Sequence, residues 1–320
     1  MLFVATSCGN SWLDLEPSTS VDTETSIKIL SDVEFTLNGI YSTMQSSDAY
    51  SGRLVYYGDV TGDDMQAVSS TKRVANYYRF NFTKDDNPSS HWSYLYSIIQ
   101  NCNLILMNID KLVIDEDDKA YRDDLKGEAL AIRGLALFDL TRIFGYPYLK
   151  DNGASLGVPI IEGLSTIDSK PTRNTVAQCY TKIIDDLTQS LSLLGEKFNK
   201  GKINKWGAMV LLSRVYLYKG ENANALKMAS DAITGAEKNK YALWTNEDYP
   251  TAWGEDASAS KPGEVLFEIV NLTTDSPGKE SMGYLNSYDG YDDMCITCSF
   301  YQFLKEDPKD IRLKLSLIHI

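Results

Sequence analysis

Residues 127–145 read Gly-Glu-Ala-Leu-Ala-Ile-Arg-Gly-Leu-Ala-Leu-Phe-Asp-Leu-Thr-Arg-Ile-Phe-Gly. Apolar residues recur in this stretch at intervals of three or four, the spacing of one face of an α-helix, and Leu135 and Phe138 add a second apolar side. A helix that is apolar this far around is buried on more than one side. The pattern therefore predicts a helix over residues 121–144 that is buried on more than one side and that Gly145 ends.

Helical periodicity continues on both sides of this segment. It predicts amphipathic helices over residues 25–45, 92–109 and 176–194, and two more between 204 and 235 that are separated by a turn at 219–222. Between the helices, the sequence is rich in Ser, Gly, Asp, Pro and Tyr, most clearly in an irregular stretch at 46–90 and a loop at 151–171. Beyond residue 236 the sequence is loop-rich, and 264–270 alternates as a β-strand does.

The helix pair between 204 and 235 carries the spacing of a tetratricopeptide repeat. Small residues fall where paired helices of that repeat must approach closely. The matching positions are Leu212, Ser213, Tyr216, Gly220, Ala225, Ala229 and Ala232. We predict a mainly α fold with a tetratricopeptide-like helical-repeat body, loop-rich insertions and a less regular C-terminal part that contains short strands.

The composition excludes several classes of function. The 320-residue chain has 31 Lys and Arg against 44 Asp and Glu, a net charge of −13, so it lacks the basic surface that nucleic-acid binding needs. It has only two histidines, His91 and His319, and no histidine spacing typical of a metal site, so we expect no metal and no cofactor. Its 20 tyrosines exceed the 10 phenylalanines and favour a half-hydrated binding surface, because a tyrosine ring is apolar while its hydroxyl is polar.

The five cysteines are odd in number and widely spaced, so they do not indicate a disulfide framework. Cys102 and Cys179 lie in helical patterns and are expected to be buried. Cys295 and Cys298 form a C-x-x-C without the partners of a zinc site, and we interpret them as buried or loop cysteines. Cys8 follows a short apolar run and two small polar residues, the pattern of a bacterial lipoprotein cleavage site, which predicts lipidation of Cys8.

Four segments in this order resemble the SusD/RagB family of surface glycan-binding lipoproteins of Bacteroidetes. They are the cleavage site with Ser11-Trp-Leu-Asp-Leu-Glu-Pro17; Trp92-x-x-x-Tyr96-x-x-Ile99-x-x-x-Asn103; the segment 127–147; and Tyr180-x-x-Ile183-Ile-Asp-Asp186-Leu187 with Ala208-x-x-Leu-Leu-x-Arg214-Val-Tyr-Leu-Tyr218.

The resemblance also implies a domain organisation. It assigns residues 1–7 to a truncated signal, 8–24 to a lipid-attached tether and 25–240 to the helical-repeat domain, with the insertion at 46–90. Residues 241–320 would begin the C-terminal region of the family. Because family members are usually longer, we expect the sequence to be truncated at both ends.

The resemblance implies a cell-surface protein, anchored in the outer membrane by its N-terminal lipid, that binds glycans and delivers them to a SusC-like TonB-dependent outer-membrane transporter. A peptide ligand and a helical-repeat scaffold without a small ligand remain alternatives. An enzyme is the weakest hypothesis. Glycoside hydrolysis uses two carboxylates, and the sequence has two adjacent pairs, Asp63-Asp64 and Asp185-Asp186. The pair Asp185-Asp186 is expected on a solvated helix edge, and no nucleophile motif accompanies either pair.

Ligand contacts in this family come from loops outside the repeat helices. Loop aromatics with neighbouring charged residues suit a sugar, which offers apolar C–H faces and hydroxyls. The candidates are Asp63, Asp64, Arg73, Tyr77, Tyr78, Trp253, Tyr284, Tyr288 and Tyr291. Trp92, Tyr96, Phe138 and Tyr216 have helical spacing and are expected in the core, and Glu128 and Arg133 are expected to form a structural pair or lie at the surface.

Overall fold

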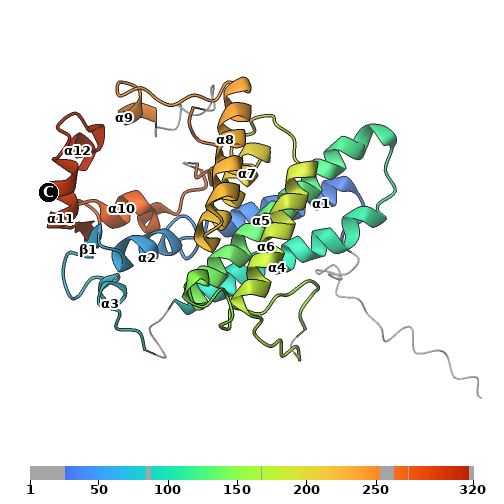
Figure 1. The fold of residues 1–320 in the computed structure, drawn as a ribbon, viewed down its shortest axis with the longest axis horizontal. Helices are drawn as coiled ribbons and strands as arrows, with labels where there is room; N and C mark the ends of the chain where they lie inside the picture. The colour runs from blue at the N-terminus through green and yellow to red at the C-terminus, as the bar shows by residue number, and fades with distance from the viewer. Residues whose placement is uncertain (1–25, 84–87, 167, 253–262, 273, 317–320) are drawn as a thin grey trace, which may run out of the picture.

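The structure is a computed structural model that describes residues 26–83, 88–166, 168–252, 263–272 and 274–316. Six helices form its body (Figure 1). They are α1 (Leu30–Met44), α4 (Ser89–Asn108), α5 (Lys119–Phe144), α6 (Val176–Leu193), α7 (Lys205–Lys219) and α8 (Asn222–Lys238). These are the helices that the periodicity predicts, and the mainly α fold is confirmed.

Helix α1 begins later than predicted because its N-terminus is fixed by a side chain. Asp32 accepts hydrogen bonds from the backbone N–H groups of Lys28 and Ile29, at 2.8 and 3.0 Å, and Ile29 has an extended backbone. An acidic side chain in the first turn satisfies N–H groups that have no partner within the helix.

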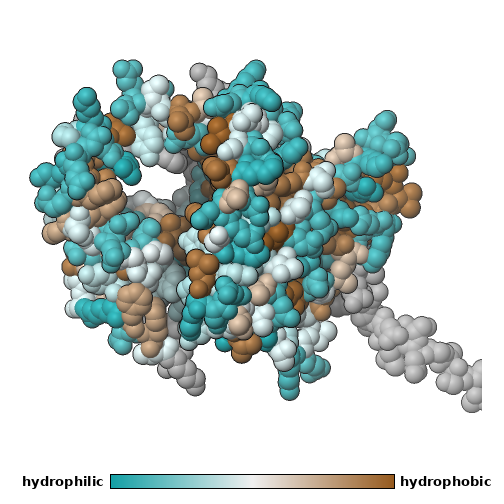
Figure 2. All heavy atoms as spheres, viewed as in Figure 1, coloured by the Kyte–Doolittle hydropathy of each residue, from teal (hydrophilic) through white to brown (hydrophobic). Residues whose placement is uncertain are grey.

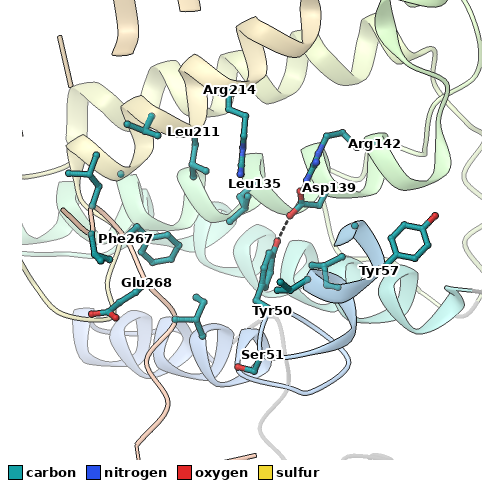
Figure 3. A pocket seen from close by; sticks show the side chains of 18 of the residues that line it. Tyr50, Ser51, Tyr57, Leu135, Asp139, Arg142, Leu211, Arg214, Phe267 and Glu268 are labelled. Carbon is teal, nitrogen blue, oxygen red and sulfur yellow. Dashed lines mark hydrogen bonds and ion pairs between the residues drawn. The ribbon is translucent and has the colours of Figure 1, made fainter. Parts of the chain in front are cut away.

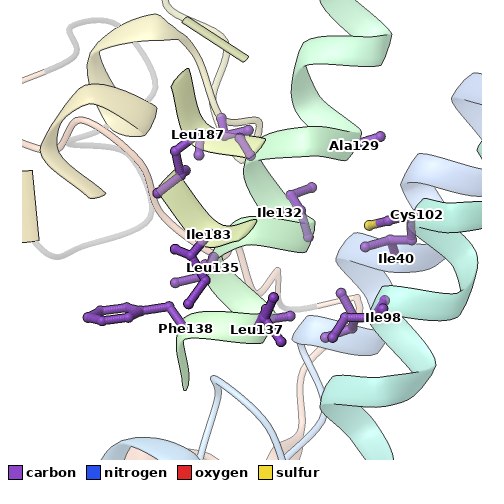
Figure 4. Close-up of a cluster of buried hydrophobic side chains, with 14 of the residues drawn as sticks. Ile40, Ile98, Cys102, Ala129, Ile132, Leu135, Leu137, Phe138, Ile183 and Leu187 are labelled. Atoms are coloured by element: carbon purple, nitrogen blue, oxygen red, sulfur yellow. The ribbon is translucent and has the colours of Figure 1, made fainter. Parts of the chain in front are cut away.

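Helix α5 lies at the centre of the body. It packs against α4 on one side and α6 on the other, α1 covers α4 and α5, and α7 and α8 continue the series from α6. Every residue from Gly127 to Thr141 is buried, so the predicted burial of this helix on more than one side is confirmed. Figure 4 shows the apolar side chains of α5 lying between Cys102 of α4 and Leu187 of α6. At Gly134 an added Cβ would lie 3.0 Å from Leu187, so glycine allows the two helices to approach.

Helices α7 and α8 form the tetratricopeptide-like pair. Gly220, with a φ of +83°, ends α7 and turns the chain into α8. Ser213 stands where the repeat has glycine, and its hydroxyl donates a hydrogen bond of 2.8 Å to the carbonyl of Ala225 across the pair. Ala225 and Ala232 are buried, so small residues serve the close approach that their spacing predicts.

A small lobe stands beside the body at the left of Figure 1. It contains α2 (Arg53–Thr61), β1 (Met65–Ala67), α3 (Ala75–Tyr78), α10 (Met282–Asn286), β2 (Met294–Ile296) and α11 (Cys298–Leu304). Strands β1 and β2 pair antiparallel, with Met65 opposite Ile296 and Ala67 opposite Met294. The lobe has its own apolar core, made of Tyr56, Val60, Val74, Tyr77, Leu285 and Met294.

Two sequence predictions need correction here. The stretch 46–90 is not an irregular loop, because it holds α2, β1 and α3, which become ordered against residues 282–296. The segment 264–270 is not a strand, since no strand pairs with it in the described part of the chain. Its alternation has another cause: Phe267 and Ile269 pack against the main core.

The remaining elements are short. They are the 3₁₀ turns η3 (Ile109–Lys111), η4 (Glu116–Asp118), η5 (Tyr148–Lys150) and η6 (Gly278–Glu280), and the helices α9 (Tyr249–Ala252) and α12 (Ile311–Ser316). Figure 2 shows the surface hollowed between the small lobe and the helical body. Among the described residues, no helix combines the length and the apolar character that crossing a bilayer requires.

Candidate functional site

The small lobe joins two segments that are about 220 positions apart in the sequence. The N–H of Val68 donates to the carbonyl of Asp293 at 3.2 Å and extends the β1–β2 pairing. Lys72 Nζ donates to the carbonyl of Tyr291 at 2.5 Å. These contacts place residues 68–73 against the tyrosine-rich turn 284–291.

Arg73 makes the most extensive contacts between the two segments. Its Nε donates to Asp293 at 3.0 Å, and its Nη1 donates to both carboxylate oxygens of Glu280 at 2.9 and 3.1 Å. Its guanidinium carbon lies 4.0 Å from the centroid of the Tyr291 ring, a cation–π contact. Burial acts to lower the pKa of Arg73, but the charges of Asp293 and Glu280 outweigh it and raise the pKa, so the group remains a cation.

The turn 284–291 presents three tyrosines at different depths. Backbone hydrogen bonds close it, from Tyr291 N–H to the Tyr284 carbonyl at 3.0 Å and from Asp293 N–H to the Leu285 carbonyl at 2.9 Å. The rings of Tyr284 and Tyr291 meet edge to face, with centroids 5.2 Å apart. Tyr291 is 38% exposed and Tyr288 is 79% exposed. The Tyr288 ring is therefore largely in solvent, while the rings of Tyr284 and Tyr291 support each other.

The structure brings together four of the predicted site residues: Arg73, Tyr284, Tyr288 and Tyr291. The other candidates on 46–90 lie elsewhere in the small lobe. Tyr77 is 8% exposed and packs edge-on against Tyr57, whereas the neighbouring Tyr78 is 39% exposed. Asp63 and Asp64 are exposed at the start of β1, where their backbone carbonyls accept hydrogen bonds from Thr297. Trp253 and Cys8 lie outside the described residues.

A cleft of about 940 Å³ lies where the small lobe meets the body. Helices α2, α5 and α7 and the segment 264–271 form its walls (Figure 3). Leu135, Leu211 and Phe267 line it with apolar surface, and Arg214 and Glu268 add charge. The cleft is therefore mixed in polarity.

A hydrogen-bonded group lies in this cleft that the sequence analysis missed. The Tyr50 hydroxyl donates to Asp139 at 2.7 Å, and Arg142 also binds Asp139 (Figure 3). Burial and then the charge of Asp139 raise the pKa of Tyr50 well above its usual value, so the phenol stays a neutral donor. The available signal was the pair Asp139 and Arg142, three residues apart in the mostly apolar C-terminal part of α5.

The structure corrects the assignments of the charged residues on α5 and α6. Arg133 is buried and donates to both carboxylate oxygens of Asp186, at 2.7 and 2.8 Å, and to Asn103 at 2.8 Å. Asp186 is fully buried, so only its neighbour Asp185 lies at a solvated edge. Glu128 does not pair with Arg133; it accepts a hydrogen bond of 2.7 Å from Tyr41. The carboxylates Asp185 and Asp186 are therefore not a catalytic pair.

Cys102 and Cys179 are buried, as predicted. Cys295 lies on β2 and is half-buried, while Cys298 begins α11 and is exposed. Neither is a fully buried or a loop cysteine, which corrects our sequence interpretation. Across the described ranges, no three His, Cys, Asp or Glu side chains are grouped closely enough to hold a metal ion. Trp92, Tyr96, Phe138 and Tyr216 all pack in or against the main core, as predicted.

Comparison with known proteins assigns the family. Residues 11–217 match the SusD-like family that is described as starch-binding and associating with the outer membrane. This match covers more than half of the sequence, and the chain belongs to this SusD-like family.

The similar proteins are longer than this chain. It is 82% identical to a protein from Bacteroides vulgatus ATCC 8482, named as a candidate sugar-binding protein, whose crystal structure it matches with a TM-score of 0.88 over 91% of this chain and 65% of that one. A SusD superfamily protein from the same strain is 38% identical, with a TM-score of 0.85 over 90% of this chain and 65% of that one. The SusD-like protein P2 of Formosa agariphila is 26% identical over 91% of this chain, which spans 55% of that protein.

Proposed function

We propose that this SusD-like chain captures glycans at the cell surface and passes them to a TonB-dependent outer-membrane transporter without breaking bonds. The observation that carries the proposal is the tyrosine-rich turn 284–291, which the Arg73 contacts hold against the small lobe. The family description as starch-binding and outer-membrane-associated supports the same reading.

The physical basis is the match between this surface and a sugar ring. A tyrosine ring offers a flat apolar face to the C–H groups of a sugar, and its hydroxyl exchanges hydrogen bonds with sugar hydroxyls. Tyr288 is the most exposed ring of the turn, and Tyr284 and Tyr291 are braced in fixed orientations. Bracing reduces the rotamer freedom that is lost on binding, which favours affinity without a deep pocket.

A glycan array with the purified chain tests ligand class and chemistry together. We expect binding to at least one oligosaccharide family and no binding to a peptide library. Chromatography of the bound oligosaccharide should recover it at its original length. Cleavage of the oligosaccharide would contradict capture without catalysis, and selective peptide binding would favour the alternative peptide cargo.

The transporter and the anchor are separate parts of the proposal. Cross-linking in cells should recover a TonB-dependent transporter with the wild-type protein. The variant Cys8→Ser should leave the membrane fraction if Cys8 carries the lipid. Membrane retention of Cys8→Ser would contradict lipid attachment but not glycan capture.

A further inference from the structure

The segment that follows α3 carries exposed aromatic rings that the sequence analysis did not select. Phe80 is 63% exposed and Phe82 is also exposed, although a phenylalanine side chain gains stability by leaving water. The two rings meet edge to face, with centroids 6.4 Å apart. Phe80 and Phe82 therefore form one apolar patch on the small lobe, which we call the phenylalanine surface.

The core of the small lobe supports this surface. The centroid of the Phe82 ring lies 5.9 Å from that of Tyr77 and 6.4 Å from that of Tyr57. Tyr77 belongs to the same apolar core as Leu285, which lies in the tyrosine-rich turn. The phenylalanine surface and the turn that carries Tyr288 are therefore built on one small core.

The backbone at Phe80 is strained. Helix α3 ends in a Schellman motif, in which the N–H of Asn81 donates to the Asn76 carbonyl at 2.9 Å and the N–H of Phe80 donates to the Tyr77 carbonyl at 3.0 Å. Phe80 occupies the left-handed position of this motif, with a φ of +54°, where glycine is the usual residue. A bulky side chain is disfavoured there, and this ring gains little from burial in return. Residues held in such conformations cluster at ligand sites.

We propose that Phe80 and Phe82 form a second sugar-contact surface of the small lobe, separate from the turn 284–291. This inference rests on the proposed glycan capture and adds a further part to the binding surface. A phenyl ring has no hydroxyl group, so these two rings contact the apolar C–H face of a sugar ring by stacking. The strained backbone keeps the Phe80 ring in water, where a sugar can reach it.

Variants of Phe80 test the surface. Titration calorimetry with the oligosaccharide selected on the glycan array gives the dissociation constant. Phe80→Ala removes the ring and should raise this constant roughly threefold to tenfold, while Phe80→Tyr keeps a ring and should bind as the wild type does. The control Phe35→Ala removes a phenylalanine of similar exposure, 72%, from α1 and should leave the affinity unchanged.

The outcomes separate this surface from glycan capture itself. Unchanged affinity in Phe80→Ala, or an equal loss in Phe35→Ala, overturns the phenylalanine surface but leaves capture at the tyrosine turn standing. Failure of every glycan to bind the wild-type protein overturns the proposed function.

Phe80→Gly distinguishes the role of the ring from that of the backbone. Glycine adopts a positive φ without steric cost, so Phe80→Gly should melt about 1–2 °C above Phe80→Ala. Both variants lack the ring and should bind the oligosaccharide equally weakly. A melting temperature of Phe80→Gly at or below that of Phe80→Ala would overturn the strain at this position, and wild-type affinity in Phe80→Gly would overturn stacking on the ring.

Discussion

Arg133 shows how the body accommodates a charge at its centre. The guanidinium reaches Asp186 of α6 and Asn103 of α4, and Asn103 in turn donates to the carbonyls of Ile161 and Gly163 at 2.8 and 2.9 Å. A buried charge is tolerated only when its partners satisfy it. This network therefore links α4, α5, α6 and the loop that precedes α6.

The variant Arg133→Met should be strongly destabilising. It leaves Asp186 buried with only Lys182, at 3.2 Å, as a cationic partner, and breaking a buried pair costs about 3–5 kcal/mol. Urea unfolding gives the change in the free energy of unfolding. As a control, Arg122→Met removes the partly exposed ion pair with Asp123 and should cost less than about 1 kcal/mol. Equal losses for the two variants would contradict a structural role for the Arg133 network.

Glu128 predicts a pH dependence of stability. Burial raises the pKa of its carboxyl to about 7, against the opposing effects of the Tyr41 hydrogen bond and of Lys202, while Asp124 and Glu34 add to the rise. Because the folded protein holds this proton more tightly than the unfolded chain, stability falls as pH rises from about 4.5 to about 7 and then levels off, a loss on the order of 3 kcal/mol.

Glu128→Gln isolates this effect. The variant cannot ionise, so its free energy of unfolding relative to wild type should increase between pH 5 and pH 7.5. The difference between the proteins cancels other titrations, including that of His91, whose pKa burial lowers. The exposed control Glu116→Gln should show no such trend, and a flat difference for Glu128→Gln would contradict the raised pKa.

At the scale of the element, the close contact of α8 with α7 depends on Gly235. An added Cβ there would overlap the ring of Trp206, whereas nothing lies within 4 Å of the same position at Gly39 in α1. Gly235→Ala should therefore destabilise the protein by about 1–3 kcal/mol, and Gly39→Ala should stabilise it by up to about 1 kcal/mol through helix propensity. Thermal unfolding measures both. Changes of the same sign would contradict the packing of this helix pair.

The helices were predictable because each buries one face, and burial leaves a period of three to four in the sequence. In α5 a second apolar side adds to this period, and Gly127 to Thr141 is buried throughout. Periodicity could not find α2 or the β1–β2 pair, because these short elements are ordered by contact with residues far along the chain. Periodicity also placed Asp186 wrongly at a solvated helix edge. Asp185 is exposed there, whereas Asp186 is buried because it faces Arg133 on α5.

At the scale of the whole molecule, the candidate site forms where two distant segments meet. Residue type and an expected loop position predicted Arg73, Tyr284, Tyr288 and Tyr291 as ligand candidates. Nothing in the sequence joins Arg73 to Tyr291 or to Glu280. The cleft around Tyr50 and Asp139 was missed for the same reason, because α2, α5, α7 and the segment 264–271 each contribute a part of it. The excess of tyrosine predicted a half-hydrated binding surface. Tertiary contacts decide which tyrosine rings lie together on that surface.

The affinity of the variant Tyr288→Ala for the oligosaccharide selected on the array tests glycan capture by the tyrosine turn most directly. The Tyr288 side chain is 79% exposed, so removing it should leave the free energy of unfolding unchanged. Losing one stacked ring weakens the free energy of binding by about 1.4 kcal/mol, which raises the dissociation constant about tenfold. We expect that loss for Tyr288→Ala and none for Tyr146→Ala, which removes an exposed tyrosine just after α5. Unchanged affinity in Tyr288→Ala, or an equal loss in Tyr146→Ala, would contradict binding at the turn.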